Sequence, residues 1–236
     1  FMLDFDLTEE QRLLEQAVRE WGAREVAPRI RELDRQHRFD PAILPQMAEL
    51  GLLGCSVPQE YGGAGMDYVS LGLISEELEY VDTSLRVIMS VHVGLNCLTL
   101  LTWGTEDQKQ RYLVPQAQGR KLATYGLTEP AAGSDVRGLQ TVAVKKGDRY
   151  YLTGEKMWIS LADVADNFLV FAWSDLEKKK QRDPSGISAF IIERGFKGFS
   201  SGTLKEKWGI LAGNTGFFKM EDVEVPEENI VGRLGE

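Results

Sequence analysis

The sequence predicts an α+β protein with two domains: an all-α N-terminal domain over residues 1–120 and an antiparallel β-sandwich or barrel-like domain over residues 121–236. Hydrophobic periodicity is the main evidence. Apolar residues recur at helical spacing up to about Lys121, whereas after Gly119 they fall in short alternating or continuous runs. With 43% hydrophobic and 27% charged residues, the 236-residue chain is of the globular class and can bury a core.

Six helices are expected in the first half. Thr8 precedes acidic residues and then apolar residues at helical spacing, so it is expected to cap the first helix. Gly51 is expected to end the third. The apolar segment 88–103 contains His92 and Asn96 and is shorter than the ~20 apolar residues of a membrane span, which favours a core helix. The later helices are predicted over residues 28–36, 41–50, from about 67, 84–103 and 106–118.

Short strands are expected after residue 119. The turn at residues 145–149 separates two strand-like runs at hairpin distance. The lysine-rich stretch 175–184 is too polar and too short for a packed element, so it is predicted to be a solvated loop. The apolar positions of the predicted strands are Val142, Val144, Tyr150, Leu152, Phe168, Val170, Phe171, Ile187, Phe190, Ile191 and Ile192.

Charge and cysteine usage exclude several classes of function. Lys and Arg number 27 against 36 Asp and Glu, and the net charge of -9 leaves no basic surplus for nucleic acid or an anionic membrane. Cys55 and Cys97 lie far apart in apolar surroundings, which predicts buried free thiols and a cytoplasm-like compartment. With His37 and His92 they form no zinc-ligand spacing, so no metal site is expected.

Two short motifs are rejected as functional signals. Residues 198–202, GFSSG, match the nucleophile elbow of hydrolases with Ser200 as nucleophile, but no histidine follows Ser200 in the chain. Residues 62–65, GGAG, lack both the third glycine and the preceding strand of a dinucleotide-binding loop. An ordinary loop between helices is predicted there.

Two further segments carry a candidate site. Residues 122–138, LATYGLTEPAAGSDVRG, place hydrogen-bonding side chains in an apolar run, followed by small residues that let a ligand approach the backbone. This composition favours a site for a flat polar ligand, and an ordinary strand and turn is the alternative. Residues 154–160, GEKMWIS, add Trp158, although a lone tryptophan belongs more often to a core than to a cofactor wall.

The two segments together closely resemble the flavin-binding signature of the acyl-CoA dehydrogenases, in which T-E-P-x-x-G-S-D precedes a later W-I-S or W-I-T. The segments LTEEQ, LGLLG, EYGGAGMD, WGTEDQKQRYL and EDVEVPEENIVG also have counterparts in that family. The resemblance implies a helical N-terminal domain, a middle β-domain and a C-terminal four-helix bundle, which is absent from this chain because it ends at Glu236. The family's catalytic glutamate comes from that bundle, so no catalytic residue is expected here and Glu129 is interpreted as structural.

The resemblance also implies FAD as the cofactor. Thr128 is expected near the reactive N5 edge of the flavin, and Ser134 is expected to meet the pantetheine arm of CoA. The residues expected to contact the flavin are Tyr125, Gly126, Leu127, Thr128, Gly133, Ser134, Trp158, Ile159 and Ser160.

One helix carries a hypothesis about the substrate. Arg86 interrupts an apolar run, and Ser90 lies four residues further on, so both project from one face of the helix. In glutaryl-CoA dehydrogenases an arginine in a similar local sequence meets the far carboxylate of the substrate, so Arg86 and Ser90 are candidate substrate-binding residues for a dicarboxylyl-CoA. An ion pair of Arg86 at the surface or between domains is the alternative, and a plain fatty or branched acyl-CoA stays open.

The resemblance implies FAD-dependent α,β-desaturation of an acyl-CoA thioester, with hydride transfer to flavin N5 and electrons passed on to an electron-transfer flavoprotein. A homodimer or homotetramer is expected, located in the cytoplasm or, in a eukaryote, in the mitochondrial matrix. The alternative function is a flavin- or CoA-binding scaffold without dehydrogenase activity.

Overall fold

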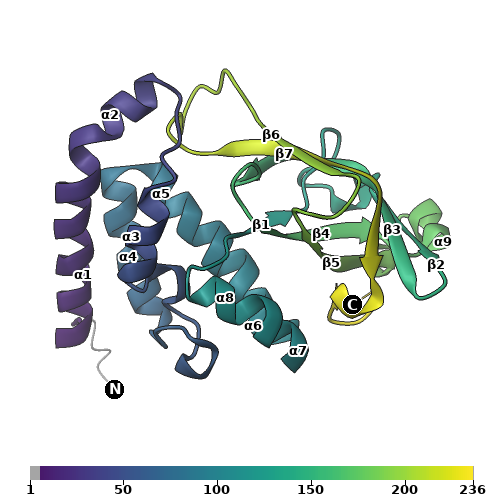
Figure 1. Ribbon diagram of the computed structural model, residues 1–236, viewed down its shortest axis with the longest axis horizontal. Coiled ribbons are helices and arrows are strands. Elements are labelled where there is room, and N and C mark those ends of the chain that lie inside the picture. Colours follow the sequence, from purple (N-terminus) through teal and green to yellow (C-terminus); the bar gives the residue numbers. More distant parts are fainter. Residues whose placement is uncertain (1–5, 236) are drawn as a thin grey trace.

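The computed structural model describes residues 6–235 and places a group of helices beside a sheet domain (Figure 1). Its helices include α1 (Glu9–Trp21), α2 (Ala27–Arg35), α3 (Ile43–Glu49), α4 (Tyr68–Val81), α5 (Thr83–Ile88), α6 (Leu98–Trp103), α7 (Glu106–Gln108), α8 (Val114–Ala117) and α9 (Leu176–Gln181). Its strands include β1 (Ala123–Gly126), β2 (Val142–Lys146), β3 (Arg149–Ser160), β4 (Asn167–Trp173), β5 (Ile187–Glu193), β6 (Phe199–Thr203), β7 (Thr215–Pro226) and β8 (Ile230–Val231).

Local sequence signals set the helix ends. The Thr8 side chain accepts a hydrogen bond from the Gln11 backbone N–H, and the Gln11 side chain accepts one from the Thr8 N–H, so the predicted cap is confirmed as a capping box. Asp67 caps α4, because its side chain accepts a hydrogen bond from the Ser70 N–H. Gly51 has the left-handed conformation, with φ of 70°, directly after α3, as predicted for a residue that ends a helix.

The apolar segment forms the long helix Thr83–Trp103, in which α5 and α6 are joined by a π-helical stretch, Met89–Cys97. The helix begins one residue before the predicted range 84–103. By length and composition alone its 21 residues could cross a membrane, so the length argument against a membrane span is wrong. Its packing agrees with a core helix, since Ile88, Met89 and Val93 are fully buried. Strand β1 packs against the π-helical stretch, so this helix reaches the sheet domain.

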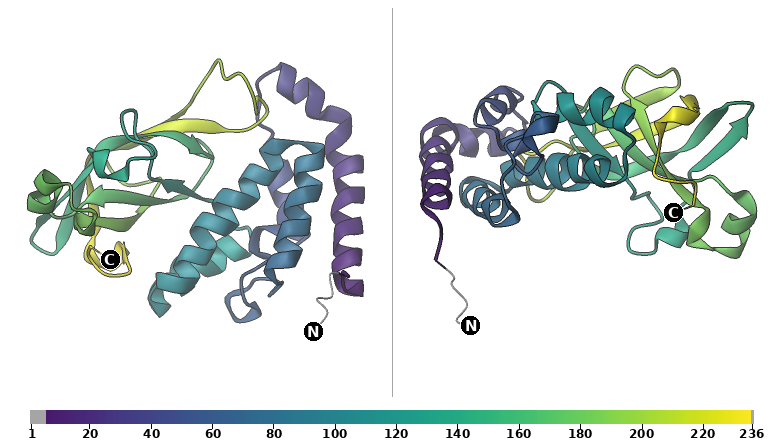
Figure 2. Two further views of the ribbon diagram at one scale, coloured as in Figure 1. Left: turned by 180° about the vertical axis from the view of Figure 1, so that it is seen from behind. Right: turned by 90° about the horizontal axis from the view of Figure 1, so that it is seen from below.

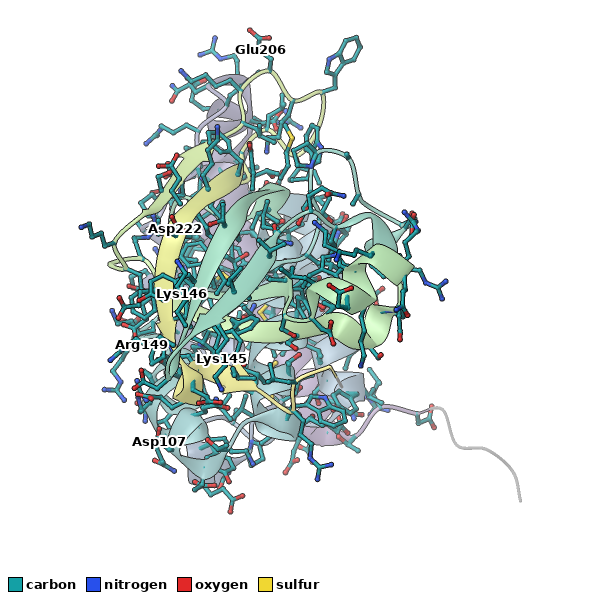
Figure 3. The ribbon with its side chains drawn as sticks, turned by 90° about the vertical axis from the view of Figure 1, so that its right-hand side faces the viewer. Asp107, Lys145, Lys146, Arg149, Glu206 and Asp222 are labelled. Atoms are coloured by element: carbon teal, nitrogen blue, oxygen red, sulfur yellow. The ribbon has the colours of Figure 1, made fainter. Side chains whose placement is uncertain are left out.

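The sheet is mixed rather than antiparallel, which corrects the predicted strand arrangement. Its order is β6-β7-β3-β2-β4-β5-β8, and β1 pairs with β4 in parallel from Ala123 opposite Asn167 to Gly126 opposite Val170. Parallel pairing is possible because β2 and β3 lie between β1 and β4 in the chain and provide a long crossover. The predicted hairpin of β2 and β3 is confirmed. Figure 3 shows its charged end, with Lys145, Lys146 and Arg149.

The lysine-rich stretch is helical, so the predicted loop at residues 175–184 is wrong. The Asp175 side chain accepts from the N–H groups of Glu177 and Lys178 and thereby caps α9. Glu177 in its first turn and lysines in its last turn complement the helix dipole. The capping hydrogen bonds and the interaction of charged side chains with the helix dipole can stabilise a short polar helix that buries little surface. Hydrophobic periodicity does not detect such a helix.

The two rejected motifs lie where the sequence analysis predicts no chemistry. Ser200 is in β6, opposite Lys219 of β7, and a strand rather than a helix follows. Residues 62–65 lie in the connection between α3 and α4, with Gly62 and Gly65 in the left-handed region.

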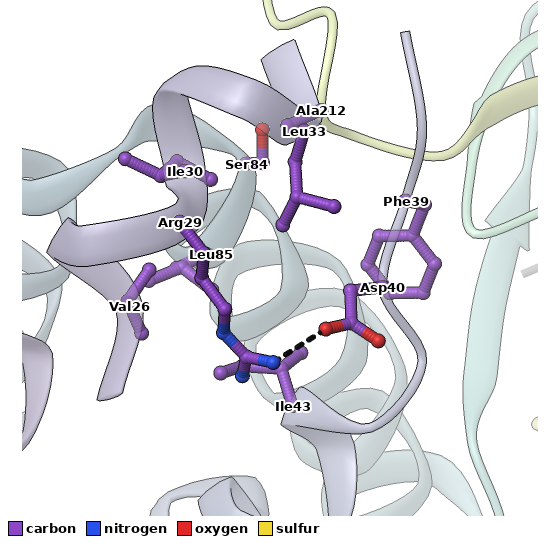
Figure 4. Close-up of a pocket in the computed structure, with 10 residues that line it drawn as sticks. All are labelled: Val26, Arg29, Ile30, Leu33, Phe39, Asp40, Ile43, Ser84, Leu85 and Ala212. Carbon is purple, nitrogen blue, oxygen red and sulfur yellow. Dashed lines mark hydrogen bonds and ion pairs between the residues drawn. The ribbon is translucent and has the colours of Figure 1, made fainter. Parts of the chain in front are cut away.

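The helical and sheet parts share a hydrophobic core. One continuous cluster of buried residues includes Ile88 and Val93 of the long helix together with Phe168 and Phe218 of the sheet. Figure 2 shows the two parts side by side from behind and from below. The connection between β6 and β7 also reaches the helices: Ala212 lies beside Leu33 and Ser84 around a small cavity of about 20 Å³ (Figure 4). These contacts fix the helices relative to the strands that carry the candidate site.

Candidate functional site

The two signature segments lie side by side. The backbone N–H of Met157 donates to the carbonyl of Thr128 over 2.9 Å. The Thr124 hydroxyl donates to the carbonyl of Ser160. The stretch after β1 is therefore joined to the end of β3, although Trp158 lies 30 positions after Thr128 in the sequence. The structure thus brings the two predicted halves of the site together.

Three features leave room for a ligand at this junction. Thr128 is half-buried, and its hydroxyl has no hydrogen-bond partner among residues 6–235. A Cβ added at Gly133 would meet no atom within 4 Å, and Ser134 is exposed. By contrast, a Cβ at Gly126 would lie 2.4 Å from the Phe218 ring, so Gly126 is required by packing. Its predicted contact with the flavin can involve only its backbone.

Trp158 owes its position to a β-bulge. The pairing of β3 with β7 shifts between Met157 and Ile159, and Trp158 has φ of 61°, which is unusual for a bulky residue. The bulge leaves the indole 60% exposed while Ile159 is only 3% exposed. The exposure of Trp158 is compatible with its predicted contact with the flavin, which stays a prediction. The Ile159 side chain is part of the core, so this residue offers a ligand only its backbone. Ser160 is half-buried beside it.

Tyr125 borders an open groove of about 770 Å³ between the end of α6 and the sheet. Its ring packs against Phe171 at 4.9 Å between centroids, and Trp103 lines the opposite side. Burial raises the pKa of Tyr125, so its hydroxyl stays protonated at neutral pH and can donate to a ligand.

A buried ion pair lies beneath the junction. The Lys156 ammonium is 2.8 Å from the Glu129 carboxylate, and the two side chains are 0% and 4% exposed. Glu129 also accepts from the N–H groups of Gln140 and Thr141 and from the Thr141 hydroxyl. Burial acts against its charge, but Lys156 and these donors lower the pKa of Glu129. Burial lowers the pKa of Lys156 to about 8, partly offset by Glu129. This geometry agrees with the structural interpretation of Glu129.

His92 joins the long helix to the strand that begins the site. Its Nδ1 accepts from the Ala123 N–H of β1 over 3.0 Å, and its Nε2 lies 3.1 Å from the Gln116 carbonyl at the end of α8. These partners require a neutral ring with the proton on Nε2. Complete burial lowers the pKa of His92 to about 4, so the neutral form is present at pH 7.

Arg86 and Ser90 lie together as predicted, and Arg86 also has an acidic partner. Arg86 Nη1 donates to the Ser90 hydroxyl over 3.0 Å, and Arg86 Nε is 2.8 Å from the Glu79 carboxylate. Hydrogen bonding to Arg86 lowers the pKa of Glu79. The ion-pair alternative is therefore present in the structure. Arg86 Nη2 has no partner among the described residues 6–235, so the guanidinium keeps donors for another acceptor.

Sequence reasoning missed Lys156, His92 and Glu79. A signal was available for Lys156, because it has the same parity along β3 as the inward-facing Tyr150 and Leu152. A lysine at an inward position needs a buried partner. No comparable signal exists for His92, whose partners come from α8 and β1.

Comparison with known proteins identifies the family. Models of the N-terminal and middle domains of acyl-CoA dehydrogenases match residues 8–120 and 124–223. The chain belongs to the acyl-CoA dehydrogenase family. It is 46% identical over 233 residues to a short-chain specific acyl-CoA dehydrogenase of Clostridium acetobutylicum, covering 99% of this chain and 60% of that protein. It is 38% identical to a glutaryl-CoA dehydrogenase of Desulfococcus multivorans, covering 99% and 60%. The chain thus spans about 60% of the length of these curated relatives.

Solved structures agree with the fold. A chain in a structure of the electron transferring flavoprotein of Acidaminococcus fermentans matches with a TM-score of 0.94 at 41% identity, covering 99% of this chain and 60% of that one. A glutaryl-CoA dehydrogenase in complex with glutaryl-CoA matches with 0.92 at 37%, covering 99% and 59%. An acyl-CoA dehydrogenase of Bacillus anthracis complexed with FAD matches with 0.89 at 36%, covering 99% and 39%.

FAD is the cofactor of this family member, and the residues present fit it. The unbonded hydroxyl of Thr128 and the open backbone at Gly133 would provide polar contacts for a ring edge. The exposed indole of Trp158 provides an aromatic surface. The predicted cofactor and family are therefore confirmed, while the individual residue assignments stay predictions.

Proposed function

We propose that the complete protein is an FAD-dependent acyl-CoA dehydrogenase that introduces an α,β double bond into an acyl-CoA thioester. The observation that carries the proposal is the junction of the two signature segments through the Met157 N–H and the Thr128 carbonyl. It brings the segment that carries the unbonded Thr128 hydroxyl beside the strand that carries the exposed Trp158 indole. Because the chain spans about 60% of its curated relatives, the activity is proposed for the whole protein.

When bound, FAD supplies the acceptor for the hydride that leaves the β-carbon of the substrate. The residues of this chain hold and orient the reactants. Thr128 donates a hydrogen bond at the reactive edge of the flavin, and Trp158 excludes water from one side. Gly133 lies by the flavin and Ser134 meets the pantetheine arm of CoA, which aligns the thioester for removal of its α-proton.

A short unsubstituted acyl-CoA and a dicarboxylyl-CoA are both substrate candidates. The similarity to short-chain enzymes supports the first. The unpartnered Nη2 of Arg86 supports the second, because a guanidinium can hold a carboxylate while it stays bonded to Glu79 and Ser90. The ion pair with Glu79 also fixes the direction in which those donors point.

Electrons are proposed to pass to an electron-transferring flavoprotein. The match to a chain in the Acidaminococcus fermentans flavoprotein structure supports this class of partner. A homodimer or homotetramer is the proposed assembly.

Flavin absorption tests the proposal. The complete protein is loaded with FAD and titrated with butyryl-CoA or glutaryl-CoA without oxygen. We expect the visible flavin band to bleach and the enoyl-CoA product to form in proportion. Binding of acyl-CoA without bleaching would support the scaffold function instead.

A further inference from the structure

Lys156 has an unusual environment for a lysine. Its side chain is 0% exposed, and its ammonium donates to the Leu127 carbonyl over 3.1 Å and to Glu129 over 2.8 Å. Leu127 and Glu129 are the two neighbours of Thr128 in the chain. The ammonium therefore holds the backbone carbonyl before Thr128 and the carboxylate side chain after it, and Thr128 is the residue expected at the reactive edge of the flavin.

The same lysine is connected to the other half of the site. Met157, its neighbour in β3, donates its N–H to the Thr128 carbonyl over 2.9 Å. Trp158 follows at the bulge. A displacement of Lys156 would thus move the Leu127–Thr128 backbone and the base of the bulge together.

Stability alone does not account for this pair. Removing two charges from water is costly, and replacement of a buried ion pair by apolar residues of similar volume is often neutral or stabilising. The surroundings would accept an apolar side chain, since Phe218 and Met220 of the same sheet are buried nearby in the strand that pairs with β3. A fixed geometry at the Leu127 carbonyl is what the ammonium provides and a methionine would not.

We propose that Lys156 is a positioning residue for FAD: through the Leu127 carbonyl and the Glu129 carboxylate it sets the place of Thr128 against the flavin and thereby controls flavin affinity and reduction potential. The proposal rests on the assignment of the flavin to this junction. It does not depend on which acyl-CoA is oxidised.

The test compares the complete holoprotein with the double variant Lys156→Met/Glu129→Gln, which removes both charges and keeps similar volumes. The matched control is Lys207→Met. Lys207 is a half-buried lysine in the same domain whose ammonium donates to the Ile210 and Gly213 carbonyls, each over 2.7 Å. FAD affinity, the visible circular dichroism of bound FAD and its reduction potential are measured for all three proteins.

We expect the double variant to bind FAD at least tenfold more weakly, about 1.4 kcal/mol, with altered flavin circular dichroism and potential. The control should keep all three values. Wild-type affinity, dichroism and potential in a folded double variant would overturn the proposal and leave the pair a structural element.

A second variant covers the case in which the double variant does not fold. Thr141→Val removes a hydroxyl that donates to the same Glu129 oxygen as Lys156, and it leaves both charges in place. We expect weaker FAD binding and altered flavin dichroism, and unchanged values would overturn the proposal. These readouts need no turnover, so a protein that binds FAD without oxidising acyl-CoA contradicts the proposed function alone.

Discussion

Two ion pairs in this molecule each join a glutamate to a basic side chain, but one pair is buried and the other is partly exposed. Lys156 and Glu129 are 0% and 4% exposed and lie beneath the junction of the two signature segments, whereas Arg86 and Glu79 are 34% and 45% exposed on the helical domain. Water screens the attraction between Arg86 and Glu79 and can replace either partner. Lys156 and Glu129 are buried, so water cannot replace either charge when the other is removed. The difference in burial is the basis on which we assign a positioning role to the first pair and propose a substrate contact for the second.

The largest effect is expected from breaking the buried pair on one side. Glu129→Ala leaves the Lys156 ammonium buried without its counter-ion and should lower the free energy of unfolding by about 3–5 kcal/mol. Glu79→Ala is the matched control and should cost at most about 1 kcal/mol, because Arg86 stays partly solvated. Urea unfolding of the FAD-free proteins measures both. Equal losses would remove the contrast between the two pairs.

The pH dependence of stability extends the comparison to a buried group whose hydrogen-bond partners are backbone groups. His92 is buried beside Ala123 and Gln116, and the folded protein favours its neutral form. Its folded pKa of about 4 lies below the ordinary 6.5, so the unfolded state binds more protons between these values and stability rises with pH there. Below pH 4 the free energy of unfolding is lower by the full contribution of His92, about 3 kcal/mol, since one pKa unit is about 1.36 kcal/mol.

Denaturant unfolding between pH 3 and 8 isolates this contribution as the difference between wild type and His92→Gln, since Glu129 titrates in both. The two curves should converge toward acid pH. A constant difference between wild type and His92→Gln over the whole range would mean that His92 does not titrate with unfolding.

The elements that the sequence predicts are those whose signals are local. Thr8 caps α1 through Gln11, three residues away, and the β2–β3 hairpin follows from its turn. The parallel pairing of β1 with β4 depends on residues more than 40 positions apart, from Ala123 to Asn167, and no pattern within either strand specifies it. Long-range pairing is decided by packing of the whole sheet.

The same distinction applies to the site. Motif resemblance points to Thr128 and Trp158 because each half of the family signature is a short contiguous segment. It does not show that a bulge directs the Ile159 side chain into the core. Lys156 is inside the signature and still escapes notice, because its role depends on Leu127 and Glu129 on another segment. Function resides in contacts between segments, which a linear pattern does not record.

Arg86 tests whether the exposed pair contributes to specificity. If its guanidinium binds an ω-carboxylate, Arg86→Met in the complete enzyme should lower kcat/KM for glutaryl-CoA at least about a hundredfold, or roughly 2.7 kcal/mol. Turnover of butyryl-CoA should be kept or improved. A parallel fall for both substrates would make Arg86 a structural residue, and no change for either would place it outside the acyl site.

The smallest effect is expected at the flavin edge. Thr128→Val keeps the shape of the side chain and removes one neutral hydrogen bond, worth about 0.5–1.5 kcal/mol, so FAD affinity should fall only several-fold. Thr124→Val is the matched control: the Thr124 hydroxyl is buried and already bonded to the Ser160 carbonyl, so its loss should reduce unfolding stability more than it changes the flavin spectrum. Unchanged flavin spectra, affinity and reduction rate in Thr128→Val would remove Thr128 from the site, and the free hydroxyl at the junction would then need another ligand.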